Sequence, residues 1–245
     1  MTSKRLLAGI VISAAYCAAS AADTPDSAPA RFDLGAKPLT TVLTPPKLRK
    51  AEDVTVRCIA QISNKGFIAQ VGCYPMRDSQ DARRVIRRIE EATVRTTIQP
   101  AVVDGRSATV WALFQIRVQG GDRDRTWALY PNHLDDPKLN DMGFIAPQRV
   151  SIIYEPTCRT IPVIPLEIRI NAVGNADQIA VPPGVNDACY DEIAVIVQNN
   201  RFIAARRDGT PEAGVMATSL VQSLRGRERQ SLLDQEFERM WYGNY

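Results

Sequence analysis

The chain contains a single histidine, His133, and this scarcity removes most of the residue sets from which active sites are built. Catalysis needs a convergent group of reactive side chains. No Gly-rich phosphate loop, HExxH pair or nucleophile elbow occurs either. We interpret His133, which lies near Asp135 and Asp136, as an ordinary surface residue. The sequence therefore predicts a protein that is not an enzyme and that carries no cofactor.

The net charge of the chain is also small. The 245 residues carry a formal charge of +3, and removal of Lys4 and Arg5 with the amino-terminal segment described next leaves +1. A balance this close to neutral does not indicate a nucleic acid or an anionic surface as the partner. We expect no nucleic-acid binding.

Residues 1–22 have the features of an export signal. Lys4 and Arg5 precede an apolar run from Leu6 to Ala15, and Ala19-Ser20-Ala21 supplies the small residues of a cleavage site. The uncharged segment from Leu6 to Ala21, about 16 mostly small residues, is short of the roughly 20 that a spanning helix needs. Cleavage is therefore the expectation, with no membrane span afterwards, and an uncleaved anchor is the alternative.

Four cysteines remain after the signal segment, and an even number in an exported chain indicates disulfides. No C-x-x-C spacing occurs, which disfavours a metal site. Cys58 and Cys73 fall on the inner face of two strands predicted at 54–62 and 67–73. Cross-strand Cβ atoms approach closely enough there for a disulfide. We predict Cys58–Cys73 and Cys158–Cys189 pairs.

The predicted hairpin has one apolar face. Capping residues and the helical spacing of apolar residues also predict two helices. Asp78-Ser79 starts the first helix and Asn186 the second. The outward arginines of the first helix are interpreted as a solubilising surface, with binding of an anionic partner as the alternative. The hairpin face comprises Val54, Val56, Cys58, Ala60, Ile62, Phe67, Ala69, Val71 and Cys73. The buried helix positions are Ala82, Val85, Ile86, Ile89 and Ala92, then Cys189, Ile193, Ile196 and Val197; the arginines are Arg83, Arg84, Arg87 and Arg88.

One pattern occurs twice, which indicates a duplicated unit. An offset of 104 places Asp104-Gly105 on Asp208-Gly209, together with the apolar strands that follow at 110–118 and 215–220. Upstream, an offset of 112 places Ile170 and Val185 at the positions of Cys58 and Cys73, which predicts an apolar pair in place of the disulfide. Each unit is then a hairpin, a helix and a last strand. The predicted fold class is α+β, with two units of three antiparallel strands packed on one helix (β-β-α-β), and a pseudo-dimer as one way of joining them.

The remaining segments complete the predicted organisation. Residues 23–50 contain five prolines and little periodicity, which predicts an extended leader. One face of a predicted terminal helix carries Leu232, Leu233, Phe237, Met240 and Trp241. The regions are a signal peptide 1–22, a leader 23–50, a first domain 51–118, a connection 119–150 with one apolar patch, a second domain 151–224 and a helix 225–245.

The order of these features resembles TonB carboxy-terminal domains over roughly residues 54–118 and 165–224. Arg201-Phe202 and Asp208-Gly209-Thr210-Pro211 resemble the Arg-Phe and Asp-Gly-x-Pro elements of that family. The first copy has Pro100-Ala101 and Asp104-Gly105, but Thr97-Ile98 stands in place of Arg-Phe. Individually these motifs are short, and the resemblance rests on their order in two copies.

The resemblance implies a periplasmic protein of a Gram-negative bacterium. Family members that transduce energy keep a membrane anchor and add a strand from an outer-membrane transporter to their own sheet. This chain departs from them in its cleavable start, its short leader and the missing Tyr-Pro element before the first strand. The resemblance therefore supports the fold and strand addition more than energy transduction.

The leading hypothesis is a non-enzymatic binding or structural module of the cell envelope. An apolar last strand offers backbone groups to a partner strand, and 110–118 is longer than 215–220. The partner is an envelope protein or a transporter segment. The alternatives are that the two units pair these edges with each other, or that an anchored chain transduces energy. The candidate edge residues are Val110, Ala112, Phe114, Ile116 and Val118.

Overall fold

The computed structural model describes residues 27–44, 46–48, 53–119, 126–133, 143–150 and 163–221. Over these ranges the protein is α+β, with mostly antiparallel sheets and few helices, as expected. The predictions for the signal peptide, for Cys158 and for the terminal helix concern residues outside the described ranges.

Among the helices of the described ranges, none has the length and apolar character needed to cross a membrane.

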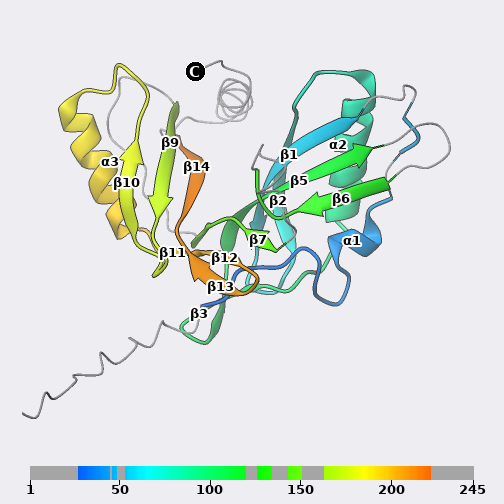
Figure 1. The fold of residues 1–245 in the computed structure, drawn as a ribbon, viewed down its shortest axis with the longest axis horizontal. Helices are drawn as coiled ribbons and strands as arrows, with labels where there is room; N and C mark the ends of the chain where they lie inside the picture. Colours follow the sequence, from blue (N-terminus) through cyan, green and yellow to red (C-terminus); the bar gives the residue numbers. More distant parts are fainter. Residues whose placement is uncertain are drawn as a thin grey trace, which may run out of the picture.

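The larger sheet has six strands and is built around β5 and β1. Its order is β11-β8-β5-β1-β2, and β6 also pairs with β5, beyond the end of β8. Helix α2 packs on one face of this sheet (Figure 1). The strands are β1 (Val54–Ile62), β2 (Ile68–Pro75), β5 (Val110–Gln119), β6 (Thr126–Tyr130), β8 (Gln148–Val150) and β11 (Phe202–Ile203), and the helix is α2 (Gln80–Thr93).

Helix α2 begins where the sequence predicts. Ser79 is its N-cap, and the Ser79 hydroxyl accepts a hydrogen bond from the backbone N–H of Ala82 at 3.0 Å. Val85 and Ile89 lie on the buried side of the helix. The opposite face of β5 is covered too, because Leu113 and Gln115 are buried. Both faces of this strand are therefore interior.

The predicted Cys58–Cys73 disulfide is present, and Cys58 and Cys73 are directly opposite each other in the register of β1 and β2. The prediction that Phe67 and Ala69 continue the inner face is wrong. A bulge shifts the register between Gln61 and Ile62, so that Ile68 pairs with Ile62 and packs on the core in their place. Phe67 and Ala69 are exposed as a result.

The predicted extended leader is a packed part of the first core. Phe32 is 1% exposed, and its ring centroid lies 4.6 Å from that of Phe114. Helix α1 (Leu39–Val42) follows, and Leu39 is fully buried. The backbone of Ala28 pairs with Val102, and that of Arg31 with Gln99. The proline-rich composition concealed a few large apolar residues that the core takes up.

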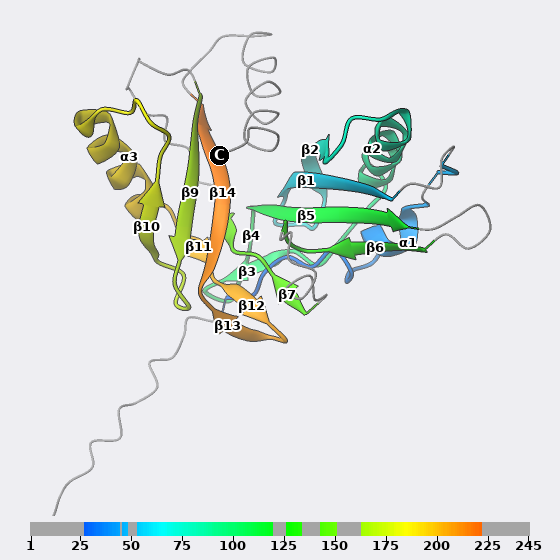
Figure 2. The same cartoon turned by 45° about the horizontal axis from the view of Figure 1, so that its top comes forward.

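A smaller sheet, in the order β10-β9-β14, carries the second core with helix α3 (Figure 2). Asn186 caps α3 as predicted, accepting from the Cys189 N–H at 2.9 Å. The expected Ile170–Val185 pair does not form, because Ile170 pairs with Ala176 across a tight turn held by the Asn171 side chain. These elements are β9 (Val163–Ile170), β10 (Ala176–Ala180), α3 (Asp187–Asn199) and β14 (Gly214–Val221).

The repeated Asp-Gly pairs form equivalent turns. Asp104 and Asp208 have φ values of 53° and 50°, and the glycine after each is also at positive φ. Each turn closes a short hairpin that leads directly into the last strand, β5 or β14. The hairpins are β3 (Ala101–Val103) with β4 (Arg106–Ala108), and β12 (Ala205–Arg207) with β13 (Thr210–Glu212).

The predicted connection 119–150 contributes strands. Its β6 and β8 join the larger sheet, and β7 (Phe144–Ile145) pairs with β12. Leu129 is buried, which agrees with an apolar patch around Trp127–Tyr130. Figure 1 shows β7, β12 and β13 between the two sheets, while β11 pairs with β8 in the larger one. The connection therefore ties the second half of the chain to the first.

Candidate strand-accepting edge

The prediction that β5 offers a free edge is wrong. All five predicted residues, Val110, Ala112, Phe114, Ile116 and Val118, are fully buried in the first core. One side of β5 pairs with β1 along its length, and the other side pairs with β8 at its start and with β6 at its end. The alternative, in which β5 pairs with β14, does not occur either. Segments that looked like a connection supply the additional strands.

Strand β14 is the last strand of the second half, and it lies at the edge of its sheet. Its eight residues pair with β9 from Gly214↔Ile170 to Val221↔Val163. Among the strands that the structure describes, none pairs with the other side of β14. The sequence pattern ranked this strand second because it is shorter than β5.

The edges of the smaller sheet differ in how well they are protected from further pairing. Natural edges are protected by short length, charged residues, bulges or proline. Strand β10 has five residues, includes Asp177 and has a register irregularity between Ala176 and Gln178. Strand β14 has the sequence GVMATSLV, without charge or proline. The composition of β14 is that of a strand that can accept another.

The two faces of β14 differ in exposure. Met216 and Thr218 are buried toward the second core. Val215 is 57% exposed, and its neighbours across the ladder on β9, Arg169 and Glu167, are exposed as well. Side chains alternate along a strand, so a strand added to β14 would place every second side chain beside the second core and the others in solvent.

The start of β14 is held closely by its surroundings. A Cβ atom at Gly214 would lie 2.7 Å from the Ala205 Cβ and 2.9 Å from the Pro147 Cγ. Both neighbours are short or rigid, so only glycine fits without a shift of the backbone. This contact anchors the strand to the β12–β13 hairpin and to the segment between β7 and β8.

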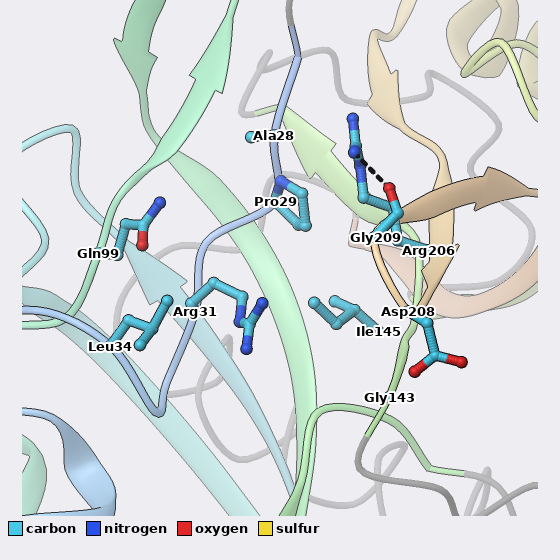
Figure 3. A pocket seen from close by; sticks show the side chains of 10 residues that line it. All are labelled: Ala28, Pro29, Arg31, Leu34, Gln99, Gly143, Ile145, Arg206, Asp208 and Gly209. Carbon is cyan, nitrogen blue, oxygen red and sulfur yellow. Dashed lines mark hydrogen bonds between the residues drawn. The ribbon is translucent and has the colours of Figure 1, made fainter.

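A cavity of about 280 Å³ lies beside this junction, between the leader and the β12–β13 hairpin (Figure 3). Its cationic groups already have partners. The Arg206 guanidinium donates to the carbonyl oxygens of Gly209, at 2.7 Å, and Ser27. Arg31 makes a two-point contact with Asp33, with N–O distances of 2.9 and 2.7 Å. The cavity therefore holds a satisfied polar junction and offers little for binding an anion.

Electrostatics at this junction follow from the same contacts. The hydrogen bond from Arg31 holds the pKa of Asp33 below its ordinary value, against the opposing effect of partial burial. In the larger sheet, Arg149 of β8 pairs with Trp111 of β5 on one side and with Phe202 of β11 on the other. Burial lowers the pKa of Arg149.

The interpretation of His133 as an ordinary surface residue is also corrected. Its Nε2 atom lies 2.8 Å from the carbonyl oxygens of both Cys58 and Phe114. Since both partners are acceptors, Nε2 carries the proton. His133 is half-buried and bonds to the backbone of β1 and β5 together. Its role is structural in this arrangement.

The remaining predictions concern Cys189, the arginines of α2 and metal binding. Cys189 is disulfide-bonded, and its predicted partner, Cys158, lies outside the described ranges. Three of the α2 arginines have acidic neighbours within 4.0 Å, through Arg83–Asp78, Arg84–Asp81 and Arg88–Glu91. In the part of the chain that the structure describes, no group of three or more His, Cys, Asp or Glu side chains is placed to hold a metal.

Comparisons with protein-family models, with curated proteins and with solved structures found no match to this chain.

Proposed function

We propose that the protein is a non-enzymatic module of the Gram-negative periplasm that binds an extended segment of an envelope partner by strand addition at β14. In this proposal the two halves are TonB-C-like units, each with a hairpin, a helix and a last strand. The order of elements supports it, since β1-β2-α2-β5 and β9-β10-α3-β14 follow the same sequence. The proposed partner is an envelope protein or a segment of an outer-membrane transporter.

The observation that carries the proposal is the occupied edge of β5. Strands β5 and β14 hold equivalent places, because each follows an Asp-Gly hairpin directly and each borders the first strand of its sheet. In the first half, β6 and β8 add to this edge from other parts of the chain. Strand addition at the last strand thus already occurs within the molecule, and β14 presents the corresponding edge in the second half.

The geometry specifies the chemistry of the partner segment. An eight-residue edge offers roughly four outward N–H groups and four outward C=O groups. Each hydrogen bond adds about 0.5–1.5 kcal/mol net, so backbone pairing alone supports weak to moderate binding. Alternating apolar residues in the partner would extend the face of Met216 and Thr218. We expect a segment of about eight residues with every second side chain apolar.

Site-specific photo-crosslinking in intact cells tests this function. A photoreactive phenylalanine analogue at Val215 should form an adduct with an envelope protein, because this side chain lies beside the edge. The matched control is the same analogue at Val195 of α3, which is 56% exposed against 57% for Val215. Ala217→Lys should abolish the Val215 adduct, since a lysine on an edge strand opposes pairing.

Hydrogen exchange supplies an independent reading on the isolated protein. The outward amides of β14 should exchange faster than those of β5, which is paired on both sides.

In the crosslinking experiment, equal adducts at Val215 and Val195, or adducts unaffected by Ala217→Lys, would show that β14 is not the binding edge. Mass spectrometry of the mature amino terminus distinguishes this module from an anchored energy transducer, which requires residues 1–22 to remain attached.

A further inference from the structure

A second exposed apolar surface lies in the first half, well separated in sequence from β14. Phe67 is 53% exposed and Val94 is 85% exposed, and both line a hollow of about 460 Å³ together with Val42. Phe67 is displaced outward by the bulge at the start of β2, and Val94 follows the last residue of α2. Two unrelated local features thus place large apolar side chains around one hollow.

The charges around this hollow are all positive. Lys37 and Arg95 line it, and no acidic side chain does. Among the described residues, neither cation forms an ion pair, in contrast to the paired arginines earlier on α2. Lys37 is exposed, and the Arg95 side chain makes one long hydrogen bond of 3.4 Å, from Nε to the Glu91 carbonyl. Both cations are available to a ligand.

The end of helix α2 would ordinarily oppose an anion here, because the last carbonyls of a helix carry partial negative charge. In this helix each of the last four carbonyl groups accepts a hydrogen bond. Their donors are Thr93 Oγ1 to Glu90, Arg95 Nε to Glu91, Arg95 N and Thr96 Oγ1 to Ala92, and Thr96 N to Thr93. Local donors therefore offset the repulsion, and the two cations dominate the hollow.

Backbone pairing is already complete at the floor of the hollow. Thr97 is bridged by Lys37 on one side and by Phe67 on the other. A ligand cannot be recognised there as an added strand, so it must be recognised by an apolar group and a charge. A single residue supplies both when it is the last residue of a polypeptide, since its side chain and its carboxylate share one Cα atom.

We propose that this hollow binds the carboxy-terminal residue of a partner polypeptide. The apolar side chain of that residue lies between Phe67 and Val94, and its carboxylate lies between Lys37 and Arg95. The complementarity is that of an anionic, apolar terminus with a cationic, apolar hollow. This site is separate from β14 and does not depend on strand addition.

An NMR titration of the 15N-labelled protein tests the proposal with the peptide acetyl-Gly-Ser-Gly-Ser-Leu-Phe carrying a free carboxylate. Chemical shifts should change at the amides of Phe67, Arg95 and Thr97 and not along β14. The carboxamide form of the same peptide should bind at least fivefold more weakly. Binding should also weaken with added salt, because both cations are exposed to solvent.

Matched variants separate the hollow from general surface effects. Val94→Ser and Lys37→Gln should each weaken the peptide at least threefold. Val195→Ser on α3 makes the same change as Val94→Ser, and Arg87→Gln on α2 likewise replaces an exposed cation by glutamine; both should stay within twofold of the parent. Circular dichroism spectra that match the parent would show that the hollow variants remain folded.

Three results would overturn the proposal. The first is equal binding of the acid and the carboxamide, and the second is full binding by the hollow variants. The third is that decanoate or phosphatidylglycerol vesicles shift these amides while the peptide does not, because the occupant would then be a lipid. Absence of any chemical-shift change at about 10 mM peptide would overturn the proposal as well, because the hollow would then not bind the peptide terminus.

Discussion

Phe32→Ala tests the finding that the supposed leader is part of the first core. Phe32 is 1% exposed and its ring packs on Phe114 at 4.6 Å between centroids. Truncation of a buried phenylalanine costs about 3–5 kcal/mol. A net stability of about 5–15 kcal/mol is usual for a folded domain, so the variant should lose a large part of it. An extended leader outside the core would show no such loss.

The matched control is Phe67→Ala, which removes the same atoms from a side chain that is 53% exposed. This variant should change the free energy of unfolding by less than about 1 kcal/mol. A double-mutant cycle between Phe32→Ala and Phe114→Ala isolates the ring contact, which we expect to contribute about 0.5–1.5 kcal/mol beyond area burial.

Urea unfolding followed by tryptophan fluorescence is the appropriate assay. Trp127 packs against the first core and Trp111 against the second. The third tryptophan is Trp241, so a background with Trp111→Phe and Trp241→Phe makes the signal report on the first core. The midpoint should fall sharply for Phe32→Ala and stay close to the parent for Phe67→Ala. Equal midpoints for the two alanine variants would refute the packing of the leader.

Three further predictions concern the disulfide, β5 and pH. Replacing Cys58 and Cys73 together by alanine should lower the free energy of unfolding by about 3 kcal/mol, because the bond closes a loop with a sequence separation of 15; non-reducing peptide mapping and urea melts check this. Leu113→Asp and Phe114→Asp should both unfold the first half, since both faces of β5 are buried, and a variant of either kind with a native circular dichroism spectrum would contradict this. The pKa of Asp33 is lowered in the folded state, so its pairing stabilises the protein above the ordinary pKa and that contribution is lost as pH falls through the lowered value. The pair is half-exposed, so Asp33→Asn should remove less than about 1 kcal/mol at neutral pH and flatten the acid dependence of the urea midpoint.

Local chemistry determined the parts of the fold that the sequence predicted well. Strand β1 has the expected bounds and inner face, and Ser79 and Asn186 cap their helices as predicted. The Cys58–Cys73 pair followed from strand alternation. These features depend on residues close together in the chain or on a hairpin, where side-chain periodicity and hydrogen-bonding groups fix the geometry.

The candidate site was the least predictable part, because a strand is an edge when no other strand pairs with one of its sides, and this depends on the rest of the fold. β5 and β14 both read as apolar last strands, and nothing local shows that β6 and β8 occupy the edge of β5. Composition also misled at the leader, where a few apolar residues among prolines join the core. A one-residue bulge decided the exposure of Phe67.

Local residue spacing was enough to predict the α+β class, the helix starts, the first disulfide and the two equivalent Asp-Gly turns. The identity of the edge strand, and the hollow that brings Phe67 and Val94 near Lys37 and Arg95, became visible in the folded chain alone. These outcomes depend on how segments distant in the chain pair, and on a register that a single inserted residue reverses.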